Sequence, residues 1–142
     1  KGSHPEPLLF RGNGNGAYYN WKRGEKVWVS GIPMGCTLIH NSILRWCWDN
    51  GEPYKTPDGT EVRRVFYTPR DAWQDPETGL FNIATGTEDL WWCDRIIKNK
   101  VLEKTGWKKL AKKKYPFLVD TGIFCQHIDP DGMQYPANAG IR

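Results

Sequence analysis

The chain has 142 residues, 39% hydrophobic and 25% charged, which excludes both a disordered polyelectrolyte and a peptide too short to bury a core. Its formal net charge of +4 at pH 7 is small, which argues against a surface built wholly for nucleic acid. Eight tryptophans supply bulky core material, so the sequence predicts one domain over residues 1–142.

Residues 1–23 are predicted to be a loop-rich lead-in. Residues 12–16 read Gly-Asn-Gly-Asn-Gly, and each Asn-Gly pair could form a tight turn. This run matches no phosphate-binding fingerprint, because no strand precedes it and no Gly-Lys-Ser/Thr follows. Residues 25–30 then alternate polar and apolar side chains, which predicts a short strand with Val27 and Val29 on one face.

A helix is expected next, capped by Asn41 or Ser42 and ending near Asn50. Residues 51–86 are rich in proline, glycine and aspartate and hold one strand-like run, residues 62–67. This composition predicts a long functional loop or insertion.

The most regular helical pattern begins at Thr87, which stands where an N-cap is expected. Glu88 and Asp89 complement the helix dipole in the first turn. A carboxylate at an exposed helix start can also be aimed into a cleft, so both acids are candidate site residues. The expected apolar face of this helix consists of Leu90, Cys93, Ile97 and Val101.

Lysines concentrate after this helix, at Lys108, Lys109, Lys112, Lys113 and Lys114. We interpret them as a solvated helix end, and an anion-binding patch is the alternative. Residues 117–120 and 123–128 are predicted to be adjacent strands.

The cysteines, Cys36, Cys47, Cys93 and Cys125, lie far apart among apolar residues and lack zinc-site spacing. With no signal-like start and no apolar run near eighteen residues, the sequence predicts a soluble cytoplasmic protein without a membrane span. Its thiols are expected to be reduced and buried.

His127 follows an apolar run and precedes a turn-like segment with Asp129 and Asp131. A histidine at a strand end can ligate a metal, and it can equally be a half-buried side chain bonded to backbone. The Asp-x-Asp pair reads as an ordinary turn, because Pro130 and Gly132 accompany it.

Three blocks carry a family resemblance. Residues 31–39 read Gly-Ile-Pro-Met-Gly-Cys-Thr-Leu-Ile, residues 86–93 read Gly-Thr-Glu-Asp-Leu-Trp-Trp-Cys, and residues 119–128 read Val-Asp-Thr-Gly-Ile-Phe-Cys-Gln-His-Ile. In this order they resemble the C-terminal, acceptor-side half of GT-A-type nucleotide-sugar glycosyltransferases, especially short bacterial and phage proteins related to the large inverting family. The resemblance covers about residues 8–132. It implies an α/β fold, with a partial GT-A-like mixed sheet flanked by helices and residues 51–86 as a loop-rich insertion.

The resemblance also implies roles for single residues. Asp89 would be the general base that takes the proton of the acceptor hydroxyl, and Glu88 would be its orienting neighbour. His127 would ligate a divalent metal, Mn²⁺ or Mg²⁺, that neutralises charge on the leaving diphosphate. The substrate pocket would be lined by Met34, Gly35 and Cys36, with Trp91, Trp92 or Trp48 offering a ring face to a sugar.

The implied partners are a nucleoside-diphosphate sugar and a glycan or other hydroxyl acceptor. Nothing before Gly31 matches the donor-binding half of such enzymes. Either this chain is a fragment whose N-terminal donor-binding half is missing, or that half belongs to another chain, or the protein has lost catalysis. Two alternatives lack catalysis: a carbohydrate-binding module built on the tryptophans, and a structural or interaction protein. A nucleic-acid acceptor is a narrower variant, motivated by the lysines and not favoured.

Overall fold

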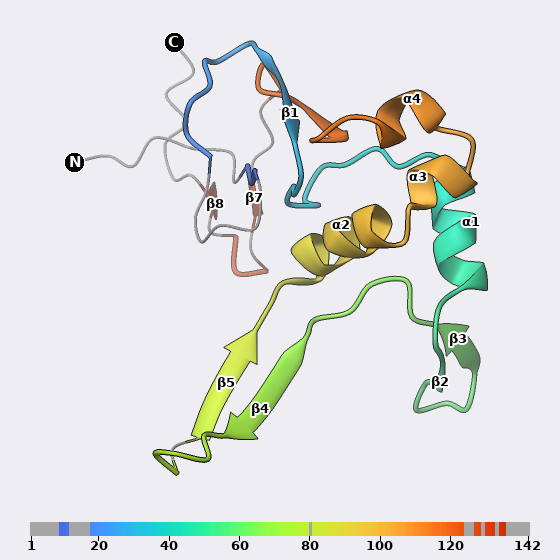
Figure 1. Cartoon of the computed structure of the whole chain (residues 1–142), viewed down its shortest axis with the longest axis vertical. Coiled ribbons are helices and arrows are strands. Elements are labelled where there is room, and N and C mark those ends of the chain that lie inside the picture. Colours follow the sequence, from blue (N-terminus) through green and yellow to red (C-terminus); the bar gives the residue numbers. More distant parts are fainter. Residues whose placement is uncertain are drawn as a thin grey trace.

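The computed structural model describes residues 9–11, 18–79, 81–123, 127–128, 130–132 and 134–135. These residues form an α/β protein, as the sequence predicts (Figure 1). The helices are α1 (Asn41–Asp49), α2 (Glu88–Lys98), α3 (Val101–Lys104) and α4 (Lys108–Ala111). The strands are β1 (Lys26–Val29), β2 (Pro53–Lys55), β3 (Glu61–Arg63), β4 (Arg70–Gln74), β5 (Phe81–Thr85), β6 (Phe117–Asp120), β7 (His127–Ile128) and β8 (Gln134–Tyr135).

The strands of the described residues form four antiparallel pairs, β1 with β6, β2 with β3, β4 with β5, and β7 with β8. The parallel neighbours that a mixed sheet requires are not among the described residues. The described partner of β6 is β1, and residues 127–128 pair with β8. The predicted pairing of residues 117–120 with residues 123–128 falls partly on residues 124–126, which lie outside the described residues. The hydroxyl of Thr121 explains the pairing of β6 with β1, since it donates to the carbonyls of Lys22 and Glu25 and ties the end of β6 to the start of β1.

The core lies between the β1–β6 pair and helices α1 to α3. Val27 and Val29 face inward, as their alternation predicts. The buried apolar residues of the described part are Leu9, Val27, Val29, Ile32, Cys47, Trp92, Cys93, Ile96, Val101 and Leu102. Leu9 belongs to the predicted lead-in, yet it is fully buried, and the neighbouring Phe10 bridges to Gly31. The lead-in therefore contributes to the core, and residues 12–17 lie outside the described residues.

Helix α1 ends at Asp49 with Asn50 as its C-cap, which confirms the predicted end. Its N-cap is His40 rather than Asn41 or Ser42. The His40 ring nitrogen Nδ1 accepts a hydrogen bond of 3.2 Å from the backbone N–H of Ser42. The imidazole of His40 thus acts as the N-cap acceptor, a role more often filled by Ser, Thr, Asp or Asn. The helix therefore begins earlier in the sequence than predicted.

Residues 51–86 do not form a single long loop, because they fold into two hairpins, β2–β3 and β4–β5. The predicted strand at residues 62–67 overlaps β3 only at its first two residues. Each hairpin has a polar turn with an Asp that accepts backbone hydrogen bonds, Asp58 in the first and Asp75 in the second. The composition that suggested a loop is therefore that of two hairpin turns.

Helix α2 starts at Glu88 with Thr87 as its N-cap, as predicted. Its buried residues are Trp92, Cys93 and Ile96, whereas Ile97, expected on the buried face, is 40% exposed. The helix stops at Lys98, and Lys100 takes a left-handed φ of 52° before α3 begins. This break separates Val101 from the helix on which the sequence placed it.

Cys47 and Cys93 are buried free thiols, as expected, but Cys36 is exposed, which corrects the prediction for that residue. Cys125 lies outside the described residues.

The five lysines of residues 108–114 are exposed, in keeping with a solvated helix end. Among the described residues, no helix has both the length and the apolar character needed to cross a membrane.

Candidate functional site

The first sequence block packs against helix α2, which the second block opens, and the third block starts in the strand that pairs with β1. The first block follows β1, the second opens α2, and the third begins in β6, the partner of β1. Gly31 packs so closely on α2 that a Cβ atom there would lie 2.7 Å from Cδ2 of Leu90. The Sγ atom of Cys93 lies 4.0 Å from the carbonyl oxygen of Ile32. Segments that are remote in the sequence therefore enclose the first half of one helix.

The start of α2 is fixed by the base of the β4–β5 hairpin. The backbone N–H of Gly86 donates to the carbonyl of Pro69 at 3.1 Å. A Cβ atom on Gly86 would lie only 2.6 Å from Cγ of Pro69, so this crossing requires glycine. The hydroxyl of Thr68 donates to Oε2 of Glu88 at 3.2 Å, which holds the Glu88 carboxylate toward the hairpin. Figure 1 shows the hairpin extending from this point away from the helices.

Asp89 is half-buried in the first turn of α2, one residue after Glu88. Within the described part of the chain, its carboxylate has no hydrogen-bond or ion-pair partner. Its charge nevertheless acts on the interior, at Cys93 one turn further along. Burial raises the pKa of the Cys93 thiol to about 11, and the negative charges of Asp89 and Asp94 add to that rise. Asp89 is thus a carboxylate without a structural partner beside a buried segment.

The predicted pocket residues Met34, Gly35 and Cys36 lie in the loop between β1 and α1. Met34 packs against the core, whereas Gly35 and Cys36 are exposed. A Cβ atom on Gly35 would meet nothing within 4 Å, so this glycine leaves open space at the surface. The close packing in the block is made by Gly31 instead, which sequence reasoning did not single out.

The two tryptophans of the second block differ in their surroundings. Trp92 is 2% exposed, and its ring is stacked against that of Phe66 at 6.0 Å and tilted against that of Phe117 at 6.2 Å. The Trp92 ring therefore presents no free face on which a sugar could stack. Trp91 is half-buried and meets Tyr67 edge-on at 5.6 Å.

His127 lies in β7, opposite Tyr135, and its side chain is outside the described part of the structure. Among the described residues, no group of three His, Cys, Asp or Glu side chains is arranged to hold a metal ion. The described carboxylates therefore do not by themselves form a metal site.

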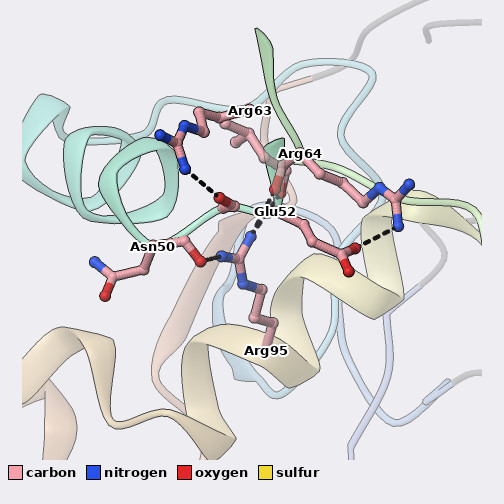
Figure 2. Close-up of polar contacts among 7 residues, drawn as sticks. Asn50, Glu52, Arg63, Arg64 and Arg95 are labelled. Carbon is pink, nitrogen blue, oxygen red and sulfur yellow. Dashed lines mark hydrogen bonds and ion pairs between the residues drawn. The ribbon is translucent and has the colours of Figure 1, made fainter. Parts of the chain in front are cut away.

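Arg95 is a structural residue that sequence reasoning missed. Its guanidinium donates hydrogen bonds to the carbonyls of Asn50 at 2.9 Å and Arg64 at 3.0 Å, as Figure 2 shows. Longer bonds of 3.4 and 3.3 Å reach the carbonyls of Cys47 and Val65. The cation thus joins the C-terminal end of α1 to the segment after β3 and complements the α1 dipole. The available signal in the sequence was its place directly before the apolar pair Ile96 and Ile97.

Two shallow grooves run along α1, away from Asp89. The first, of about 450 Å³, is lined by polar residues such as His40, Ser42 and Asp49, together with Trp46. The second, of about 540 Å³, is lined by Asn41, Leu44, Arg45, Trp48, Asp49, Val65 and Phe66. The side chains of Trp48 and Phe66 are 48% and 41% exposed, so the second groove offers aromatic surface to solvent.

Comparison with known proteins gives no further assignment, because no family model, curated protein or solved structure matches this chain.

Proposed function

We propose that this chain is the acceptor-side part of a glycosyltransferase that moves a sugar from a nucleoside-diphosphate sugar to an acceptor hydroxyl. The observation that carries the proposal is the packing of the first sequence block against the start of α2, which the second block forms, together with an Asp89 carboxylate that has no partner among the described residues. The GT-A-like architecture, including its mixed sheet, is part of this proposal.

Asp89 serves as the general base. Its backbone is held by the capped helix and by the base of the hairpin. Its carboxylate makes no hydrogen bond or ion pair with the described residues, so it is available to an acceptor. A base in this position removes the acceptor proton as the bond to the anomeric carbon forms. Glu88, held by Thr68, acts as a neighbour that orients the acceptor. Gly35 leaves open surface where a substrate can approach the backbone.

A divalent ion, Mn²⁺ or Mg²⁺, with His127 as one ligand, belongs to the same proposal. Such an ion neutralises charge on the leaving diphosphate. The described His, Cys, Asp and Glu side chains do not provide the remaining ligands of such an ion. Calorimetric titration of Mn²⁺ with a nucleoside diphosphate, in the wild-type chain and in His127→Ala, tests this part separately.

The test of the base is Asp89→Asn against Asp94→Asn. Both residues lie on α2, but the Asp94 side chain is 52% exposed and pairs with Lys98 at 2.8 Å. The assay uses the protein that includes the donor-binding half, and it follows release of nucleoside diphosphate from a panel of nucleoside-diphosphate sugars with Mn²⁺ and hydroxyl acceptors present. We expect Asp89→Asn to lower turnover about a hundred- to ten-thousandfold. Asp94→Asn should keep wild-type turnover.

Two outcomes overturn the proposal. One is the absence of both diphosphate release and donor binding across the panel in the folded wild-type protein that includes the donor-binding half. The other is an equal loss in the two variants, which would show that α2 needs its charge only for stability. Circular dichroism of both variants establishes that they fold.

A carbohydrate-binding module without catalysis is the second candidate, and one observation favours it. The groove beside α1 exposes Trp48 and Phe66 next to Arg45 and Asp49, an arrangement suited to stacking a sugar ring and bonding its hydroxyls. This candidate predicts that glycan binding is lost in Trp48→Ala, is unchanged in Asp89→Asn, and needs neither nucleotide nor Mn²⁺. A glycan array probed with these two variants separates the candidates.

A further inference from the structure

The segment around α4 carries positive charge without compensation. Residues 104–119 contain six lysines and no aspartate or glutamate, so the nearest acids along the chain are Glu103 and Asp120. The ion pairs among the described residues use Arg63, Arg64 and Lys98 as their cations, so none of the six lysines has a carboxylate partner there.

Some of these cations are positioned by aromatic rings. The Nζ atom of Lys113 lies 4.1 Å from the centre of the Trp28 ring, and that of Lys114 lies 5.3 Å from the centre of the Tyr115 ring. Such contacts hold a charge at a fixed place on the surface while leaving it hydrated on its outer side.

An exposed apolar side chain lies next to this charge. Leu118 is the Cα partner of Trp28 in the β1–β6 pair, so the two side chains stand together on one face of the sheet. Leu118 is 47% exposed, and Lys113 reaches over the ring beside it. Lys108, Lys109 and Lys112 lie on α4 and its C-cap, immediately before Lys113 in the chain. We define the lysine face as this stretch with its two neighbours, namely Lys108, Lys109, Lys112, Lys113, Lys114, Trp28 and Leu118.

We propose that the lysine face docks the protein peripherally on an anionic bilayer. Clustered lysines on one surface are attracted by the phosphate and carboxylate groups of acidic lipids. Leu118 then enters the apolar layer immediately below those headgroups, and the Trp28 ring lies at headgroup depth. In Figure 1, α4 lies at the opposite end of the molecule from the β4–β5 hairpin, so docking leaves the hairpin and the start of α2 open to solution.

Three features favour a bilayer over nucleic acid as the partner. Proteins that bind single strands use free aromatic faces to stack bases, but the Trp28 and Tyr115 rings are already covered by lysine ammonium groups. A duplex backbone, in turn, offers no apolar layer for Leu118 to enter. Lysines also act as point charges that suit dispersed headgroups, whereas planar phosphate recognition generally uses arginine.

The experiment is co-sedimentation of the chain with vesicles of phosphatidylcholine alone and with phosphatidylserine added at about a third of the lipid, a composition that makes the surface strongly negative. We expect binding only to the anionic vesicles, and loss of binding at high salt because the attraction is screened. In the triple variant Lys108→Gln, Lys109→Gln, Lys112→Gln, the partition coefficient should fall about a hundredfold, since each lysine contributes roughly a fivefold factor.

The matched control is Lys55→Gln, Lys98→Gln, Lys100→Gln, which removes the same charge from exposed lysines outside the lysine face. It should retain most of the binding. An equal loss in both triple variants would overturn the proposal, because binding would then depend on net charge alone. Failure of the wild-type chain to bind anionic vesicles would overturn it as well.

Leu118→Gln separates a bilayer from other polyanions. It should weaken vesicle binding while leaving any attraction to a 20-base-pair DNA duplex unchanged. Tighter binding to the duplex than to the vesicles would assign the face to nucleic acid and overturn the proposal. Asp89→Asn should bind vesicles like the wild type, so the fate of this inference and that of the proposed transferase are distinguishable.

Discussion

At the scale of single residues, Arg95 joins segments of the fold that are distant in the sequence. Its guanidinium donates to backbone carbonyls from two segments, and the rings of Trp46 and Trp91 lie 5.8 and 5.3 Å from it. Removing it leaves these carbonyls without a donor in a half-buried place. We expect Arg95→Ala to lower the free energy of unfolding by about 2–4 kcal/mol.

Urea denaturation measures this loss, and Lys98→Ala is its control. Lys98 lies on the same helix, but its side chain is 74% exposed and makes only an i,i+4 pair with Asp94. Its removal should cost less than about 0.5 kcal/mol. A midpoint for Arg95→Ala equal to that of Lys98→Ala would show that water replaces the guanidinium without penalty.

The buried thiol of Cys93 predicts a loss of stability in alkaline solution. Its pKa is raised by burial from an ordinary 9.0 to about 11 in the folded chain. Between these two pH values the unfolded chain loses the thiol proton while the folded chain keeps it, so stability falls as pH rises. The slope for this thiol is at most about 1.4 kcal/mol per pH unit.

Denaturant unfolding at pH 8, 9, 10 and 11 measures this dependence in the wild type and in Cys93→Ala. The variant should lose less stability across the range, although a contribution from Cys47 remains, since burial raises the pKa of that thiol too. Identical slopes in the two proteins would contradict the assignment.

At the scale of elements, Gly51 joins α1 to β2 and has no room for a side chain. A Cβ atom there would lie 2.9 Å from the carbonyl oxygens of both Cys47 and Arg64. These are backbone atoms, so they cannot move aside as a flexible side chain can. Gly51→Ala should therefore destabilise the fold by about 1–3 kcal/mol.

Gly35→Ala is the matched control, because a Cβ atom on Gly35 meets nothing within 4 Å. Thermal unfolding should give a midpoint close to that of the wild type for Gly35→Ala and a clearly lower one for Gly51→Ala. Equal midpoints would show that the α1–β2 junction relaxes around a methyl group. A stable Gly35→Ala that binds acceptor more weakly would also support the proposed substrate approach.

Local sequence signals predicted the elements whose ends are set locally. The start of α2 follows from Thr87 and two acids, and the end of α1 from Asn50. Partner choice was not predictable in this way. The pairing of β6 with β1 depends on hydrogen bonds from Thr121 to residues almost a hundred positions away, and no local pattern encodes them.

The residues of the candidate site also differ in whether local sequence signals could predict their places. Asp89 could be placed from the sequence because a helix start is a local feature, and its exposure to a partner follows from that place. The burial of Trp92 could not, because it depends on Phe66 and Phe117 from two other segments. Arg95 was missed for the same reason. Its guanidinium donates hydrogen bonds to backbone carbonyls, and every residue type has such a carbonyl, so the sequence does not indicate the partners.

At the scale of the whole molecule, the core draws on the first described residues. Leu9 is fully buried, and its carbonyl accepts a hydrogen bond from the backbone N–H of Tyr18. Leu9→Ala should therefore lower the free energy of unfolding by about 2–5 kcal/mol, as for other buried leucines. Chemical denaturation measures it, with Leu38→Ala as control, since Leu38 is fully exposed. A small loss for both would place Leu9 outside the folded unit.

The pairing of β1 with β6 also affects the order in which the chain folds. The hydroxyl of Thr121 bonds the carbonyl of Glu25 across 96 positions of the chain. Bringing such distant segments together costs roughly 4 kcal/mol of chain entropy before any contact offsets it. During synthesis, β1 emerges from the ribosome long before its partner, so its apolar face stays uncovered until residues 117–120 have emerged. The hairpins and α2 can form in that interval, and the core closes last.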